Sequence, residues 1–247
     1  AFSIEENENN GSAVGTVVAS DPDFNQNLSF AITAGNNGNA FAIDPINGLI
    51  TVSNSTALDF ETTSTFTLTV NVQDDGEGNL STNSLITITL SDVNEAPVVD
   101  NQSFDVAEFS PVGTSVGFVV ADDPDAGQNL SFSIIASSPA VAFDIDPATG
   151  EITVTDPAVL DSYLNPLFTI SIQVTDNGSG SLSDIADIAI NVLQGPNLAP
   201  VIANQLFTIA ENTSAVTSVG NVIASDPNTG QVITYAIISG NTNSAFS

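Results

Sequence analysis

The chain repeats itself, and the length of the repeat limits its fold more than any other feature of the sequence. Three kinds of residue recur at spacings of 102 and then 103 residues: Phe2, Phe104 and Phe207; Glu6, Glu108 and Glu211; Asp21, Asp123 and Asp226. A period kept by so many positions indicates tandem copies of one domain. The boundaries predicted from it are 1–97 for the first repeat, 98–200 for the second, and 201–247 for the first part of a third.

Within the first repeat, apolar and polar residues alternate, which is typical of strands with one buried face. The clearest case runs from Phe66 to Val72, and the segments 28–32 and 86–90 show the same pattern. Sequences that favour turns, such as Asn47-Gly48, separate the runs. About seven short strands per repeat, and no stretch that favours a helix, predict an all-β chain of β-sandwiches.

The third repeat is expected to be incomplete. Its first strand would open at Phe207, as Phe2 and Phe104 are expected to open theirs. Counterparts of 66–73 and 85–90 are lacking, which would leave open sheet edges and half a core. We therefore expect 201–247 to be unstable alone, completed either by further residues of the polypeptide or by another chain.

The charge balance excludes several functions. The chain has 29 acidic residues and no Lys, Arg or His, which gives a formal net charge of −29. Without a basic patch, nucleic acid and anionic membrane surfaces are not expected partners, and no apolar run approaches the length of a membrane span. Because Cys is absent too, the chain has no His, Cys or Lys to act as a poised nucleophile or base. Carboxylate pairs could serve a glycosidase, but here they recur at domain ends and not in one cleft, so we do not expect an enzyme.

Like charge at this density destabilises a compact state unless cations from solution neutralise it. A solvated acidic coat explains the acids that do not recur. The segment from Asp92 to Pro97, Asp-Val-Asn-Glu-Ala-Pro, needs a further explanation, because it falls where one repeat passes into the next. Its oxygen ligands at alternate positions suit a hard cation such as Ca²⁺, and the proline limits backbone freedom. The sequence therefore predicts β domains joined by Ca²⁺.

The recurring acids follow a recognisable order within each repeat. In the first they read Ile-Glu-Glu-Asn at Glu6, Ser-Asp-Pro-Asp at Asp21, Leu-Asp-Phe-Glu at Asp59, and Asp-Val-Asn-Glu-Ala-Pro at Asp92. This set, kept in order along the chain, resembles the calcium-binding pattern of cadherin repeats, and 41–50 matches the family's mid-domain sequence. The resemblance implies cadherin-like, immunoglobulin-like, seven-stranded Greek-key sandwiches in a linear array. The polar surface resembles the cadherin-like arrays of giant microbial surface proteins.

In cadherins, each junction draws ligands from the base of one repeat, the linker and the top of the next. The resemblance implies a first-junction metal site with nine ligands: Glu6, Asp59, Glu61, Asp92, Asn94, Glu95, Asp123, Asp125 and Asp176. Ala96 departs from the family pattern and cannot bind metal, so one position there loses a ligand. Three further acids would face a preceding repeat: Asp21, Asp23 and Asp74. Taken singly, several of these residues would also suit ordinary turns.

The second junction carries fewer charges. The resemblance implies the ligands Glu108, Asp161, Asp226 and Asn228, but Tyr163 stands where the first repeat has Glu61, and the linker 193–200 contains no acid. Because Ca²⁺ affinity follows ligand charge, this site is expected to be weak. We expect the joint to bend freely or to be held by packing of Pro196 and Leu198.

Two functions fit these observations. One is a calcium-stiffened structural array, such as a filament or adhesin stalk at the cell surface, whose partners are calcium ions, neighbouring repeats or other copies of the chain. The alternative is a module that binds carbohydrate or protein. Sugar-binding surfaces commonly stack sugars on aromatic side chains, and this chain has no Trp and only Tyr163 and Tyr235. The pattern favours the array.

Overall fold

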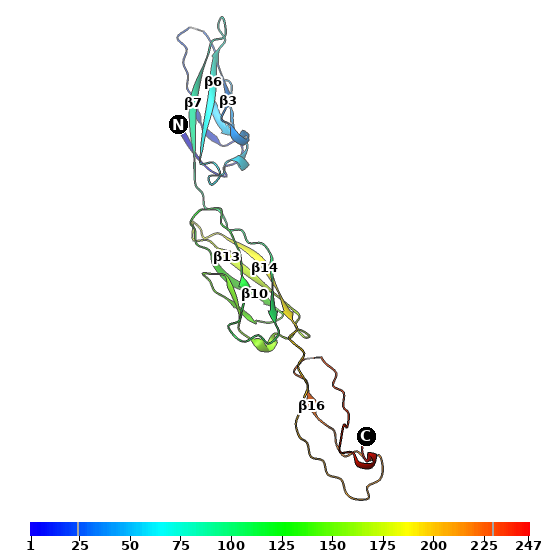
Figure 1. The fold of residues 1–247 in the computed structure, drawn as a ribbon. Helices are drawn as coiled ribbons and strands as arrows, with labels where there is room; N and C mark the ends of the chain where they lie inside the picture. The colour runs from blue at the N-terminus through cyan, green and yellow to red at the C-terminus, as the bar shows by residue number, and fades with distance from the viewer. Residues whose placement is uncertain (24, 229) are drawn as a thin grey trace. The chain divides into compact units, whose positions relative to one another are not determined.

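The computed structural model describes residues 1–23, 25–228 and 230–247, and they form an all-β chain with a few short 3₁₀ turns (Figure 1). The chain divides into two compact units. The first holds Ala1–Pro97 together with Asp122–Leu130 and Thr175–Ser183. The second holds Val98–Ala121, Ser131–Val174 and Asp184–Ser247. Two loops of the second repeat thus cluster with the first repeat and its linker.

The first repeat contains seven strands in two sheets, as the sequence predicts. The four-stranded sheet has the order β1 (Phe2–Glu5), β7 (Ser81–Ser91), β6 (Thr65–Asp74) and β3 (Leu28–Ala34). The three-stranded sheet has the order β2 (Ala13–Thr16), β5 (Leu49–Val52) and β4 (Phe41–Ile43). Strand β1 runs parallel to β7, with Phe2 opposite Ile88. The 3₁₀ turns are η1 (Asn37–Asn39) and η2 (Ser55–Ala57).

The second repeat has the same topology. Its four-stranded sheet has the order β10 (Ser131–Ser138), β13 (Leu167–Thr175), β14 (Ser183–Leu193) and β8 (Gln102–Ala107). Its three-stranded sheet has the order β11 (Phe143–Ile145), β12 (Glu151–Val154) and β9 (Ser115–Phe118), and η3 spans Pro157–Val159. Strand β8 pairs in parallel with β14. Phe104 lies inside β8 and so does not open the strand, contrary to expectation.

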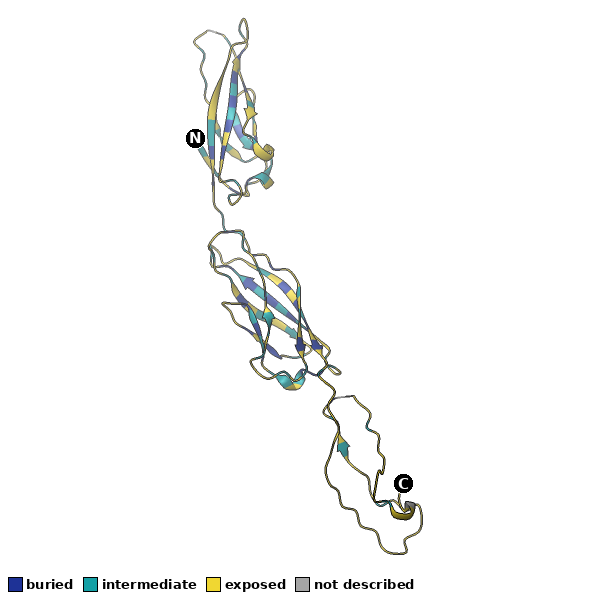
Figure 2. Ribbon diagram, in the orientation of Figure 1, coloured by how far each residue is buried: buried dark blue, intermediate teal, exposed yellow. Residues whose placement is uncertain are grey.

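The alternation in the sequence becomes alternation of burial. Along β6, Phe66, Leu68, Val70 and Val72 are buried, and most of the residues between them are more exposed (Figure 2). Each fully buried side chain of this size contributes about 1.5–3 kcal/mol to folding. The Phe66 ring meets Phe41 of the other sheet edge-on, with centroids 5.1 Å apart.

The repeating phenylalanine has a structural explanation that the sequence pattern alone does not supply. A Cβ atom on Gly15 would lie 2.3 Å from the Phe2 ring, so only glycine lets the ring lie against the backbone there. The pair recurs in the other repeats, as Phe104 with Gly117 and Phe207 with Gly220. The marker at each repeat is therefore an aromatic ring fitted to a glycine thirteen residues further along.

The third repeat is mostly irregular. Its short strands β15 (Val201–Ile202) and β16 (Ala224–Ser225) are antiparallel, and η4 spans Thr242–Ser244. The expectation that Phe207 opens a strand is wrong, because 203–223 contains none and Phe207 is 42% exposed. In the first two repeats, the equivalent strand hydrogen-bonds to the last strand of its own sheet. The described part of the third repeat offers no such partner.

Candidate metal site at the first linker

Glu6 anchors the first linker, which we define as residues 92–97. The Glu6 side chain is only 2% exposed. Its Oε2 accepts a hydrogen bond of 2.7 Å from the backbone N–H of Phe60, and its Oε1 accepts one of 2.9 Å from Val93. One carboxylate at the end of β1 thus fixes both the turn after η2 and the linker backbone.

Carboxylates converge beside this anchor inside the first unit. Glu6, Glu61 and Glu95 place one oxygen each within 4.8 Å of one another, and so do Glu61, Asp92 and Asp125. Glu61 belongs to both groups. Because the chain contains no Lys, Arg or His, no side chain can neutralise this cluster.

The loop 122–130 docks onto the linker through hydrogen bonds to acidic side chains. Asp125, only 6% exposed, accepts bonds at Oδ2 from the backbone N–H of Glu95 (2.8 Å) and from Nε2 of Gln128 (2.9 Å). The backbone N–H of Asp125 donates to Asp123 at 2.9 Å.

The loop 175–183 meets the linker through Asp176. The Asp176 side chain is buried, and its Oδ2 accepts a hydrogen bond of 3.0 Å from the side-chain amide of Asn94. Its Oδ1 accepts a bond of the same length from the backbone N–H of Gly178. The first linker is therefore held by two loops of the second repeat, 122–130 at Glu95 and 175–183 at Asn94.

Three buried side-chain oxygens at this site accept no hydrogen bond: Asp123 Oδ2, Asp125 Oδ1 and Gln128 Oε1. Buried oxygens without a donor are rare, because each loses its hydration without compensation. Carboxylate and amide oxygens are the ligands that Ca²⁺ prefers. The residues present therefore fit a hard divalent cation. A cavity of about 240 Å³ beside them is lined by Asp92, Asn94, Asp125, Gln128, Gly178 and Ser179.

Proton affinities reflect the missing counter-charge. Partial burial raises the pKa of Glu61, and the nearby charges of Glu6, Asp92 and Glu95 raise it further. Burial also raises the pKa of Asp92, and the charge of Asp125 adds to that rise. Burial is likewise the main cause that raises the pKa of Asp123, against the opposing hydrogen bond from the backbone N–H of Asp125. A group whose charged form is disfavoured by burial and by like charges gains most from a bound cation.

Asp59 stands apart from the converging carboxylates. It is exposed, and its two oxygens accept hydrogen bonds from the backbone N–H (2.7 Å) and hydroxyl (3.0 Å) of Thr62. The side chain therefore closes its own turn, a use of Asp that competes with metal binding.

Gln128 is a site residue that the sequence reasoning missed. Its Nε2 donates to Asn94 as well as to Asp125, so it joins the linker to the loop. A signal was present in the sequence, since Gln26, Gln128 and Gln231 recur at the spacings of the repeat. The pattern was hidden because an uncharged residue in a loop did not stand out among so many acids.

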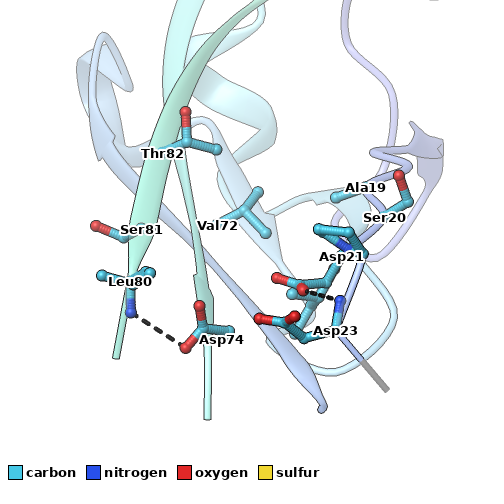
Figure 3. Close-up of a pocket in the computed structure, with 11 residues that line it drawn as sticks. Ala19, Ser20, Asp21, Asp23, Val72, Asp74, Leu80, Ser81 and Thr82 are labelled. Carbon is cyan, nitrogen blue, oxygen red and sulfur yellow. Dashed lines mark hydrogen bonds between the residues drawn. The ribbon is translucent and has the colours of Figure 1, made fainter. Parts of the chain in front are cut away.

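The three acids assigned to a preceding repeat lie together. Asp21, Asp23 and Asp74 gather at one end of an open pocket of about 290 Å³ (Figure 3). The backbone N–H of Asp23 donates to Asp21 at 2.8 Å, and Asp74 accepts from Leu80 at 3.1 Å. Oε1 of Gln26 is buried without a donor, as is Oε1 of Gln128 in the equivalent loop.

The second linker, which we define as residues 194–200, has a different environment inside the second unit. Glu108 accepts hydrogen bonds from the Ser162 hydroxyl (2.6 Å) and the Gly195 backbone N–H (2.9 Å). The Ser162 hydroxyl is the main cause that lowers the pKa of Glu108. Asp161 accepts from the backbone N–H groups of Tyr163 and Leu164. Among the described residues near this linker, no three carboxylates converge.

The last two sequence-predicted ligands, Asp226 and Asn228, lie in the loop that follows the second linker. Asp226 accepts a hydrogen bond of 2.8 Å from the backbone N–H of Asn228. Asn228, only 5% exposed, accepts one of 2.6 Å from the backbone N–H of Leu198. The loop thus docks onto its linker as 122–130 docks onto the first, with an amide in place of the carboxylate.

Comparison with known proteins agrees with the fold. A family model for the cadherin domain matches residues 1–91 and 102–193. The protocadherin-like wing polarity protein stan of Drosophila melanogaster is 34% identical over 241 residues, which is 92% of this chain and 7% of that protein. Human protocadherin-23 is 34% identical over 254 residues, 98% of this chain and 7% of that protein.

Solved structures show the same architecture. Mouse cadherin-23 EC22-24 aligns with a TM-score of 0.57 at 27% identity, covering 78% of this chain and 62% of that chain. These relatives are animal cadherins, so the comparisons do not support the microbial origin expected from the surface composition. The chain spans about 7% of the length of the two curated relatives. None of the helical segments among the described residues has the length and apolar character of a membrane span.

Proposed function

This chain belongs to the cadherin family, and we propose that it acts as a calcium-stiffened structural segment of an extracellular adhesion protein. Cadherin repeats are extracellular, and calcium-dependent adhesion is typical of the family. The role is structural and not catalytic, and the partners are calcium ions with neighbouring repeats or other copies of the chain. The functional units are the repeats 1–97 and 98–200, with 201–247 the start of a third.

The observation that carries the proposal is the set of buried oxygens without donors beside converging carboxylates. Seven acids at the first linker would hold calcium together with the amide oxygens of Asn94 and Gln128: Glu6, Glu61, Asp92, Glu95, Asp123, Asp125 and Asp176. Asp59 would join them only by giving up its bonds to Thr62. Bound calcium would supply the positive charge that the sequence lacks and would tie the linker to both loops.

We propose calcium binding also by the acids that would face a preceding repeat, but not at the second linker. Asp21, Asp23 and Asp74 would contribute ligands when a preceding repeat brings its own. The residues that the resemblance offers at the second linker, Glu108, Asp161, Asp226 and Asn228, carry fewer charges and already have hydrogen-bond partners there.

Calcium titration of the full chain tests the proposal. A ligand that binds only the folded state adds about 2.7 kcal/mol of stability at a hundredfold excess over its Kd. We therefore expect calorimetry to detect calcium binding and Tm to rise with Ca²⁺ but not with Na⁺ at matched ionic strength. Glu61→Gln removes a ligand shared by both carboxylate groups and is expected to weaken binding. Glu151→Gln, which removes an acid of β12 that belongs to neither converging group, is the control. A Tm unchanged at millimolar Ca²⁺ would refute the proposal.

A further inference from the structure

We propose that the second linker is a metal-independent joint, closed by neutral hydrogen bonds and by the Tyr163 ring against Gly230. The proposal goes beyond calcium binding at the first linker and does not depend on it. It follows from contacts inside the second unit, where the positions equivalent to Glu61, Asp92 and Asp125 carry uncharged residues and the position equivalent to Glu6 keeps its acid, Glu108.

The repeat spacing shows which residue of the second linker region corresponds to each acid of the first. Tyr163 lies 102 residues after Glu61, Gln194 lies 102 after Asp92, and Asn228 lies 103 after Asp125. The three acids that form one converging group at the first linker are thus all uncharged at the second. A random loss of charge would leave unsatisfied polar groups behind. At the second linker, the polar side chains of Glu108 and Asn228 instead have hydrogen-bond partners.

Glu108, the one acid kept at the anchor position, is satisfied locally. Its counterpart Glu6 accepts only backbone N–H bonds and lies beside two other glutamates. Glu108 accepts the Ser162 hydroxyl at 2.6 Å in addition to the Gly195 N–H at 2.9 Å. Ser162 occupies the position of Phe60, so the second repeat supplies a side-chain donor where the first has an apolar side chain.

Asn228 provides both halves of a hydrogen-bonding pair, which a carboxylate cannot. Its Oδ1 accepts from the N–H of Leu198 at 2.6 Å, and its Nδ2 lies 3.4 Å from the Pro196 carbonyl. An ionised carboxylate is an acceptor only and needs an external cation beside a carbonyl, whereas an amide carries its own donor. Gln231 adds a bond to the Asn197 side chain.

Tyr163 closes the joint by contact with the backbone. A Cβ atom on Gly230 would lie 2.8 Å from Cδ2 and 2.9 Å from Cε2 of the Tyr163 ring. Gly230 also has φ = +78°, which favours glycine. Gly127, its counterpart in the second repeat, has φ = +85° but no atom within 4 Å of its Cβ position. The ring therefore fills, at the second linker, a position that is open in the equivalent loop at the first.

Glycine amide signals allow both linkers to be followed in one sample. The chain has 17 glycines, and the full chain labelled with ¹⁵N-glycine would report on Gly178 near the first linker and on Gly195 and Gly230 at the second. Signals are assigned by Gly→Ala substitution. We expect Ca²⁺ to shift Gly178, while Gly195 and Gly230 keep the same shifts in calcium and in chelator.

Two variants test the contacts themselves. Tyr163→Leu removes the ring and its ring-current shift and is expected to move the Gly230 signal, whereas Tyr235→Leu is the control and leaves it in place. Ser162→Ala is expected to move the Gly195 signal. Gly230 or Gly195 signals that titrate with Ca²⁺, or a Gly230 signal indifferent to Tyr163→Leu, would overturn the proposal. A Gly178 signal that does not respond to Ca²⁺ would count against the first-linker site alone.

Discussion

Each linker donates a backbone N–H to a side chain of the loop that docks onto it, but the acceptor is a carboxylate at the first linker and a neutral amide at the second. At the first linker the N–H of Glu95 donates to Asp125 at 2.8 Å, and at the second the N–H of Leu198 donates to Asn228 at 2.6 Å. The docked linker is thus common to both. Among the residues that the structure describes, buried carboxylate oxygens without donors lie at the first linker and not at the second. The difference teaches that the same backbone contact can be surrounded by carboxylates or by neutral side chains, and we expect this choice to decide whether a joint needs a cation.

The largest expected effect comes from exchanging the two docking residues. Asp125→Asn keeps an acceptor for Glu95 but removes a charged ligand, so we expect calcium affinity to fall about a hundredfold, or about 2.8 kcal/mol. Calorimetry on the full chain measures this change. Asn228→Asp is the reciprocal variant. Asn228→Asp is expected to leave calcium affinity unaltered and to loosen the second linker. If Asp125→Asn kept the wild-type calcium affinity, the two docking residues would be equivalent and the comparison would fail.

The hydroxyl of Ser162 is expected to contribute the next largest effect. Ser162→Ala removes a 2.6 Å bond to the partly buried Glu108, and a hydrogen bond to a charged group contributes about 1.5 kcal/mol or more. Chemical denaturation of the full chain is the measurement. Ser171→Ala is the matched control, because Ser171 makes an equally short bond to Asp187 on an exposed surface. Equal losses in the two variants would contradict a special role for Ser162.

Alanine substitutions at the paired glycines sharpen the comparison further. Both Gly127→Ala and Gly230→Ala place a side chain at positive φ, which costs about 1 kcal/mol. Only at Gly230 does the new Cβ also meet the Tyr163 ring. We therefore expect Gly230→Ala to destabilise the chain more than Gly127→Ala, and adding Tyr163→Ala to remove the excess. The absence of any excess in urea denaturation would show that the ring does not press on this loop.

The smallest expected effect is a difference in pH dependence without calcium. The raised pKa values of Glu61, Asp92 and Asp123 mean that protonation favours the folded state. Their stabilising contribution is present at low pH and is lost as pH rises through those values. Glu108 has a lowered pKa, so its contribution is present above the ordinary value of 4.5 and is lost as pH falls through the lowered one.

Acidifying a calcium-free sample from neutral pH toward about pH 5 is therefore expected to stabilise the first linker and leave the second unchanged. Hydrogen exchange of the amides of Val93 and Gly195, which donate to Glu6 and Glu108, separates the two responses after correction for the intrinsic exchange rate. Equal changes in protection at both amides would contradict the assignment.

The sequence alone predicts much of the fold. Alternation at Phe66, Leu68 and Val70 became alternating burial in β6, because the side-chain period of a strand is a geometric constant. The expected strand at Phe207 was wrong, since a strand needs a partner and not only a pattern. The fit of Phe2 against Gly15 could not be predicted, because it depends on how the two sheets pack.

The candidate site shows the same limit. The resemblance of the acidic pattern to cadherin repeats assigns Glu6, Glu61 and Glu95 to one junction, and one oxygen of each lies within 4.8 Å of the others. The turn formed by Asp59 with Thr62 was not predictable, because a local hydroxyl and N–H compete with distant partners. Ser162 and Gln128 were missed for a related reason: neutral side chains become significant only when their contacts are known.

Diffraction from crystals of the full chain grown in calcium would test most directly that the first linker binds metal and the second does not. We expect anomalous signal from Ca²⁺ beside Glu61, Asp92 and Asp125, with oxygen ligands at about 2.3–2.6 Å. We expect none beside Glu108 and Asn228, where Tyr163 should still lie on Gly230. Ions of equal occupancy at both linkers would contradict the division between a metal-dependent and a metal-independent joint, and so would an empty first linker at saturating calcium.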